Sequence, residues 1–300
     1  MTAAVSSPEP SAPVLGHRDP DATTGFRRES MIRQVTAEPC IAMVIQRALT
    51  LEVAHSKVGA GVQEHSLFRQ QPIRRLWSTA DTALRLLYGK PEVARAAAQQ
   101  VYSLHDHING ELPEPSAAWP HGDRYTAHDS SLLLWVWATL VETSLTAYQR
   151  WLRPLSAADA DAFYADMCSF ATFFGIPPSI VPPDRDAFDV YYESVLAGDA
   201  LQPTPTSMGM VRDVLWFRAW NVPAPLVRPL RVLSIGSLDP RVTERFGLML
   251  SARDQRLFDR LDGMLRRTYR YRPGWLVHRL PEVYVALRTP TVGLSKRLGR

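Results

Sequence analysis

The stretch from Leu132 to about Leu152 constrains this chain most, because it is apolar on nearly every side of a helix. Asp129-Ser130-Ser131 precedes it and offers a side-chain oxygen to cap the helix start. A helix with so little polar surface needs other helices around it. Its longest apolar run, Leu132 to Val141, is far too short to span a bilayer. We therefore expect a buried central helix in a soluble protein.

Apolar residues at helical spacing predict further helices on both sides of this one. They cover residues 41–54, 72–88, 91–110, 156–175, 186–196 and 253–270. Gly59 and Gly61 are expected to loosen or end the first of these helices. Neither a repeat nor an alternating strand pattern is present. The predicted fold class is all-α, with a multi-helix single domain over residues 31–300 and a flexible tail over residues 1–30.

The composition is that of an ordinary globular protein, with 46% hydrophobic and 21% charged residues. The net charge of +4 is spread out, and no basic run is interleaved with aromatic residues, so nucleic-acid binding is not expected. The tail has no apolar segment of the kind found in signal peptides, and we expect no stable membrane insertion. Cys40 and Cys168 lie in apolar segments as free thiols, which suits a cytoplasmic protein. The oligomeric state stays open.

Common catalytic motifs are missing from the sequence. It has no Gly-rich phosphate loop, no G-x-S-x-G elbow, no C-x-x-C pair and no H-E-x-x-H. Most nucleotide-dependent enzymes, serine hydrolases and zinc proteases are excluded on this ground.

Histidines cluster in one part of the chain, with aspartates between them. They are His105, His107, His121 and His128. In a helix, His105 and His107 point about 200° apart and cannot bind one metal together. His105 shares its face with Val101 and Ile108, so it is the histidine expected to face inward. A packed or capping histidine is the simpler alternative at each position.

Arg75 and Thr79 are four residues apart and therefore lie on one helical face. Leu76, Trp77 and Ala80 around them predict a largely buried block. A buried arginine needs an anionic partner, from the protein or from a ligand. A solvent-facing arginine beside an uninvolved threonine is the alternative.

Several segments, in this order and spacing, resemble the MpaB and latex-clearing-protein (rubber oxygenase) family of haem-b oxygenases. They are LEVAHSKVGAGV at 51–62, RRLWST at 74–79, HDHING at 105–110, YTAHDSSLLLWVWATLVET at 125–143, FFGIPP at 173–178 and FDVYY at 188–192. The resemblance is clear over about 41–196.

This resemblance implies a helical, partly globin-like core around haem b. The family's proximal histidine motif, H-x-x-[VI]-x-[GR], falls on His105, which would bind the iron. Its Arg-x-x-x-Thr pair falls on Arg75 and Thr79; Arg75 would neutralise a propionate or polarise bound oxygen, and Thr79 would donate a hydrogen bond nearby. The implied activity is an O2-dependent oxygenation of a small or medium apolar substrate, such as an alkene or isoprenoid.

The chain also departs from the family pattern. Many relatives have a histidine where this chain has Trp137, and some have a lysine where it has Ser78. Glu52 and Glu64 are the only nearby candidates for the acid/base glutamate described for rubber cleavage. Polyisoprene cleavage itself is therefore not the expected reaction.

Three other readings remain open at this point. One is a non-catalytic haem or ligand-binding protein that uses the same pocket. Another is a non-haem metal enzyme that uses His105, His121, His128 and nearby aspartates. The last is a helical scaffold whose histidines are simply packed in its core.

Overall fold

A computed structural model describes residues 26–66, 70–216 and 224–288. The first helices are α1 (Met31–Thr36), α2 (Pro39–Met43), α3 (Ile45–Ala54), α4 (Ser56–His65), α5 (Pro72–Tyr88) and α6 (Pro91–His105). After the strands β1 (Asn109–Glu111) and β2 (Arg124–Thr126) come α7 (Ser130–Trp151), α8 (Ala157–Ala171), α9 (Arg185–Ala197), α10 (Pro205–Leu215), α11 (Ala224–Gly236), α12 (Pro240–Arg245), α13 (Ala252–Thr268), α14 (Gly274–Val277) and α15 (Leu280–Arg288). Short 3-10 turns lie at Thr172–Phe174, Asp199–Leu201 and Tyr269–Tyr271. The all-α prediction is confirmed, apart from one small antiparallel sheet.

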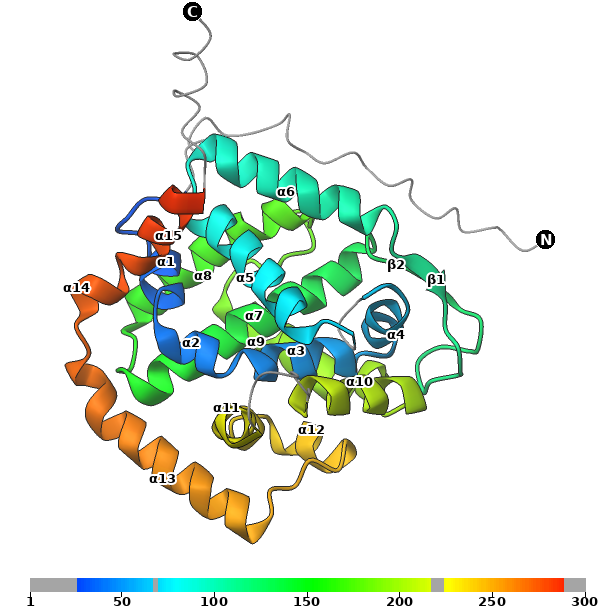
Figure 1. Cartoon of the computed structure of the whole chain (residues 1–300). Coiled ribbons are helices and arrows are strands. Elements are labelled where there is room, and N and C mark those ends of the chain that lie inside the picture. The colour runs from blue at the N-terminus through cyan, green and yellow to red at the C-terminus, as the bar shows by residue number, and fades with distance from the viewer. Residues whose placement is uncertain (1–25, 67–69, 217–223, 289–300) are drawn as a thin grey trace, which may run out of the picture.

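The central helix is α7, as its sequence predicts. It begins where the side chain of Asp129 accepts a hydrogen bond from the Ser131 amide, and it packs against α3, α2 and α8. Other helices surround it in Figure 1, with the α5–α6 hairpin on one side and α9 on another. Within the described ranges, no helix combines the length and the apolarity needed to cross a membrane.

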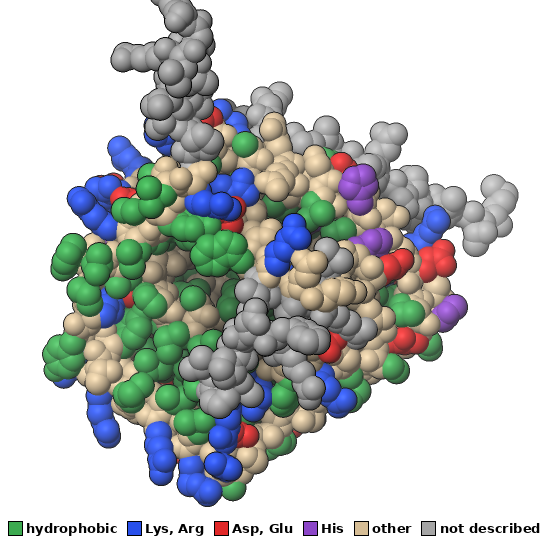
Figure 2. Space-filling model, viewed as in Figure 1, with side chains coloured by type: hydrophobic (Ala, Val, Ile, Leu, Met, Phe, Trp, Pro, Cys, Tyr) green, Lys and Arg blue, Asp and Glu red, His purple; other side chains and the backbone are tan. Residues whose placement is uncertain are grey.

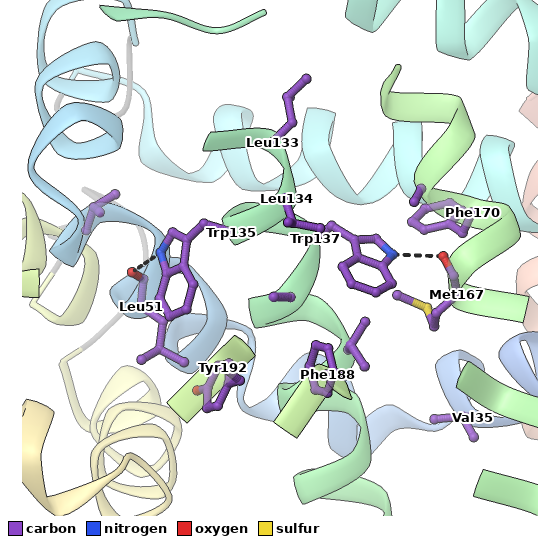
Figure 3. Packing of buried hydrophobic residues seen from close by; sticks show 14 of the residues in the cluster. Val35, Leu51, Leu133, Leu134, Trp135, Trp137, Met167, Phe170, Phe188 and Tyr192 are labelled. Atoms are coloured by element: carbon purple, nitrogen blue, oxygen red, sulfur yellow. Dashed lines mark hydrogen bonds between the residues drawn. The ribbon is translucent and has the colours of Figure 1, made fainter. Parts of the chain in front are cut away.

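Two tryptophans of α7 point to opposite sides of the helix, as Figure 3 shows. The Trp135 indole donates a hydrogen bond of 3.0 Å to the Leu51 carbonyl of α3. The Trp137 indole donates one of 2.8 Å to the Met167 carbonyl of α8. Both side chains are 1% exposed, so each buries a large apolar surface while its N–H stays paired. They fix α7 between its neighbours.

The predicted helix over 91–110 ends earlier than expected, at His105. The next residues form β1, which pairs with β2 so that Gly110 lies opposite Tyr125. A Cβ at Gly110 would lie 2.6 Å from the Tyr125 hydroxyl, so this glycine allows a close approach and does not cap the helix. The hairpin places His105 at a helix terminus.

The expected effect of Gly59 and Gly61 is also wrong. The break between helices falls at His55, and both glycines lie inside α4. A Cβ at Gly59 would lie 2.6 Å from the Val53 carbonyl and 3.6 Å from Ser207 of α10, and a Cβ at Gly61 would meet the Tyr125 ring at 3.3 Å. Small residues here let neighbouring elements approach α4 closely. The predicted flexible tail falls almost wholly on residues 1–25, outside the described residues.

Candidate functional site

The candidate site lies where α5 and α6 face α3 and α7. On α7, Val136 and Leu140 are only half-buried, although Trp135, Trp137 and Ala138 around them are buried. They share a face with Thr139. Figure 2 shows the surface hollowed beside α5, with hydrophobic side chains around the depression. Apolar side chains around a depression suit a small-molecule site.

Glu52 of α3 is the acidic residue of this region. It is half-buried, and its carboxylate accepts a hydrogen bond of 3.4 Å from the Thr139 hydroxyl of α7. Burial raises the pKa of Glu52 to about 7, although the positive charge of Arg75 and the Thr139 hydrogen bond both act to lower it. Near neutral pH this carboxyl can therefore either hold or release a proton.

Arg75 and Thr79 lie together on α5, as predicted, but they are exposed. The Arg75 guanidinium donates a hydrogen bond to the Thr79 hydroxyl, which itself donates to the Arg75 carbonyl at 2.9 Å. Among the described residues, Arg75 has no ion pair with a carboxylate.

The prediction of a largely buried block around Arg75 is therefore wrong. Trp77 is 58% exposed, Ala80 is exposed and Leu76 is half-buried. The physical reason is that α5 packs chiefly against α6 and α15, so its first half extends beyond the core. Residues that look like core in the sequence instead lie at or near the surface of α5.

His105 is the last residue of α6 and is half-buried. Burial lowers the pKa of its imidazole to about 4, and the interactions with His128 and Arg75 act in the same direction. The ring is therefore neutral at pH 7. No described residue forms a hydrogen bond with it, and the His128 ring lies edge-on with its centroid 6.0 Å away.

His128 is held beside His105 by other contacts. Its Nε2 lies 2.8 Å from a carboxylate oxygen of Asp106, and its ring centroid is 4.5 Å from that of Tyr102. His107 and His121 are exposed. Across the described residues, no three His, Cys, Asp or Glu side chains are grouped so that they could hold a metal ion. The set of ligands considered above for a non-haem metal is not assembled.

His55 and Trp137 are buried in other surroundings. His55 is 6% exposed; its Nδ1 has no hydrogen-bond partner among the described residues, and its ring lies 5.1 Å from that of Trp119. Trp137 packs between Tyr164 and Phe188, on the side of α7 that faces α8 and α9. The position where many relatives have a histidine is thus a core position in this chain.

Electrostatics link Arg75 with two other candidate residues. The charge of Arg75 lowers the pKa of the Glu52 carboxyl and also that of the His105 imidazole. Glu64, the other acidic candidate, instead accepts a hydrogen bond from the Tyr125 hydroxyl, and its side chain is 57% exposed. The sequence reasoning missed Thr139, whose signal was a hydroxyl residue within an otherwise apolar central helix.

A family model and two known proteins match parts of this chain. The family model described as "ER-bound oxygenase mpaB/B'/Rubber oxygenase, catalytic domain" matches residues 33–267. That range contains Glu52, Arg75, Thr79, His105 and Thr139.

Two relatives match about half of this chain. They are uncharacterised proteins of Mycobacterium bovis and Mycobacterium tuberculosis, each 32% identical over 156 residues. The matched region is 51% of this chain and 60% of each relative's length. No solved structure matches the chain.

Proposed function

Because this chain belongs to the family of the mpaB and rubber oxygenase catalytic domain, we propose that it is a haem-b-dependent oxygenase that acts on an apolar molecule. Membership places it among oxidoreductase-type enzymes. The observation that carries the finer proposal is a neutral, half-buried imidazole, His105, on which the cation of Arg75 acts as it acts on the Glu52 carboxyl.

The residues present fit a haem group. An imidazole binds iron through a deprotonated ring nitrogen, and the lowered pKa of His105 provides one at neutral pH. The exposed guanidinium of Arg75 has no protein carboxylate among the described residues, so it is free to pair with a propionate. Val136, Leu140 and Leu76 supply apolar contacts for a flat hydrophobic ring.

The residues of this chain would take distinct roles. His105 would bind the iron, Arg75 would hold a propionate, and Thr79 would orient the Arg75 guanidinium through the hydrogen bond between them. Haem, when bound, would supply the activation of O2. The protein would exclude water from the hollow and orient the substrate there.

Glu52 would handle protons at this site. Its pKa of about 7 lies near the operating pH, where a general acid or base is most effective. The Thr139 hydroxyl lies 3.4 Å from the carboxylate and also donates to the Val136 carbonyl at 2.7 Å. Glu52 would therefore exchange a proton with the substrate as it reacts.

The substrate class follows from the walls of the hollow. Half-buried aliphatic side chains favour a small or medium apolar molecule. Only a few polar groups would be available to orient such a substrate. The family includes rubber oxygenase, so we propose an alkene or isoprenoid chain as the substrate.

An optical spectrum of the purified protein, with two histidine variants, tests the iron ligand. We expect a Soret band that His105→Ala abolishes, because the ligand is lost. His107→Ala is the matched control, since His107 lies two residues away and is exposed, and it should keep most of the haem. A full Soret band in His105→Ala would overturn the ligand assignment.

A turnover assay separates the enzyme from a non-catalytic haem carrier. The haem-loaded protein is given O2, a reductant and candidate alkenes, and the products are followed by mass spectrometry. Oxygenated products that depend on haem loading support the proposal. Haem binding with no product from any alkene would point to a carrier instead.

A further inference from the structure

The C-terminal helices carry a group of exposed apolar side chains that we call the C-terminal apolar face. Its members are Met264, Tyr271, Trp275, Leu276, Leu280, Val283 and Leu287. Trp275 is 74% exposed and Leu287 is 82% exposed. Single exposed apolar residues are common, but a group of them indicates an interaction surface.

The geometry of α15 explains why this face points outward. Val285 is 4% exposed and packs into the core, while the Tyr284 hydroxyl donates a hydrogen bond of 2.7 Å to Asp81 of α5. Leu280, Val283 and Leu287 recur at helical spacing on the side opposite Val285. Figure 2 shows hydrophobic side chains on the side of the molecule where Figure 1 places α14 and α15, with Lys and Arg side chains among them.

The same segment is strongly basic. Residues 264–288 contain six arginines, at 266, 267, 270, 272, 279 and 288, and one acidic residue, Glu282. Arg266 pairs with Asp262, Arg272 with Glu38 and Arg288 with Asp81. Within the described part of the chain, the exposed arginines Arg267, Arg270 and Arg279 have no such partner. The C-terminal apolar face therefore borders unpaired positive charge.

A basic cleft lies at the base of this face. It has a volume of about 210 Å³, and its lining includes Arg28, Arg33, Trp275, His278, Arg279 and Glu282. The Glu282 carboxylate pairs with Arg28 and Arg33, each at 2.5 Å. Three arginines against one carboxylate leave the cleft with an excess of positive charge, directly beside an exposed tryptophan.

We propose that the C-terminal apolar face binds peripherally to an anionic phospholipid surface. Aliphatic side chains and Trp275 would enter the boundary between headgroups and acyl chains, and Arg267, Arg270 and Arg279 would contact lipid phosphates. Tryptophan and tyrosine suit this boundary because each has an apolar ring with one polar group.

The position of the face supports a lipid partner. The face lies mostly beyond residue 267, where the family match ends, so it is a feature of this chain outside that domain. It also adjoins the candidate site, since the Trp77 ring of α5 lies 5.7 Å from the Tyr284 ring of α15. A lipid surface held here would bring apolar molecules close to the hollow.

Vesicle co-sedimentation of the full chain tests the proposal. The probes are phosphatidylcholine vesicles with and without phosphatidylserine, at low and high salt. We expect binding to the phosphatidylserine vesicles only, weakened by salt, and at least about tenfold weaker for Leu287→Asp. Val190→Asp is the matched control, because Val190 is 71% exposed on α9, and it should bind like the wild type.

Three outcomes would overturn the proposal. They are equal binding to both kinds of vesicle, no binding to either, and equal loss in Leu287→Asp and Val190→Asp. A fourth is a stable dimer in lipid-free buffer that Leu287→Asp dissociates, because the face would then join two copies of the chain. Circular dichroism of each variant checks that these surface changes leave the fold intact.

Discussion

The Glu52 carboxyl combines burial with proton exchange near neutral pH. Its pKa in the folded protein is about 7, against 4.5 for an ordinary glutamate. Between these values the folded state holds the proton and the unfolded state does not. Stability from this residue is therefore fully present below about pH 4.5 and is lost as the pH rises towards 7.

Replacing Glu52 with Gln should remove this pH dependence. We expect Glu52→Gln to gain about 2 kcal/mol over the wild type at pH 8 relative to pH 4.5, because the amide never becomes charged. Urea unfolding at both pH values measures the difference, and comparison with the wild type cancels the titration of the histidines.

Glu64→Gln is the control for this experiment, because the Glu64 side chain is 57% exposed. It should follow the wild-type curve closely. If the two variants show the same dependence on pH, then the buried position of Glu52 does not control its titration.

Sequence alone indicated several of the site residues but not their surroundings. The family motifs pointed to His105 and Arg75, and the charge of Arg75 acts on the His105 imidazole. Arg75 and Trp77 proved exposed. The apolar residues around them on α5 have the same sequence pattern as residues of a helix in the core. Thr139 was missed because a single hydroxyl in an apolar helix is most often bonded only to its own backbone.

At the scale of elements, α7 was the best predicted part of the fold. Its apolar surface required a central position, and its capping aspartate marked the start. The strands β1 and β2 were not predicted, because three residues each are too few to produce an alternating pattern. The end of α6 was predicted too late in the chain, because the short strand β1 that follows it has no recognisable pattern of its own.

The position of Trp137 on α7 leads to a prediction about stability. Trp137→Ala should cost about 3–5 kcal/mol in the free energy of unfolding, because it opens a cavity between α7, α8 and α9. Trp77→Ala is the control, since Trp77 is 58% exposed on α5, and it should cost far less. Chemical denaturation of both variants gives the comparison.

Trp137→Ala also distinguishes a role of the indole in packing from a role in haem binding. Haem bound per folded molecule should stay unchanged in Trp137→Ala, because the indole faces α8, away from the Glu52 side of α7. A variant that folds normally but has lost haem would contradict this placement.

At the scale of the whole molecule, Glu38 joins the beginning and the end of the described chain. It precedes α2 and is 1% exposed. Its carboxylate accepts hydrogen bonds from the Arg272 guanidinium and from the Tyr269 hydroxyl at 3.1 Å, and it lies 3.1 Å from the His278 Nε2. Burial alone would raise the pKa of Glu38, but these partners outweigh it and lower the pKa.

Glu38→Gln should therefore destabilise the protein by about 3 kcal/mol, because it leaves Arg272 without its buried counter-charge. The measurement is the urea midpoint at neutral pH. Glu111→Gln is the control, since Glu111 and its partner Arg124 are both largely exposed and such pairs contribute little. Equal midpoints for the two variants would show that the C-terminal segment is not held by this carboxylate.

The partners of Glu38 also affect where this protein can be divided. The family match stops at residue 267, yet Tyr269, Arg272 and His278 all follow it, as does the Tyr284 that braces Asp81 of α5. Truncation after residue 267 would leave the buried Glu38 carboxylate without these partners. It would also remove the Tyr284 hydrogen bond from α5, the helix that carries Arg75. The part of the chain that matches the family model is thus shorter than the part needed for a stable fold.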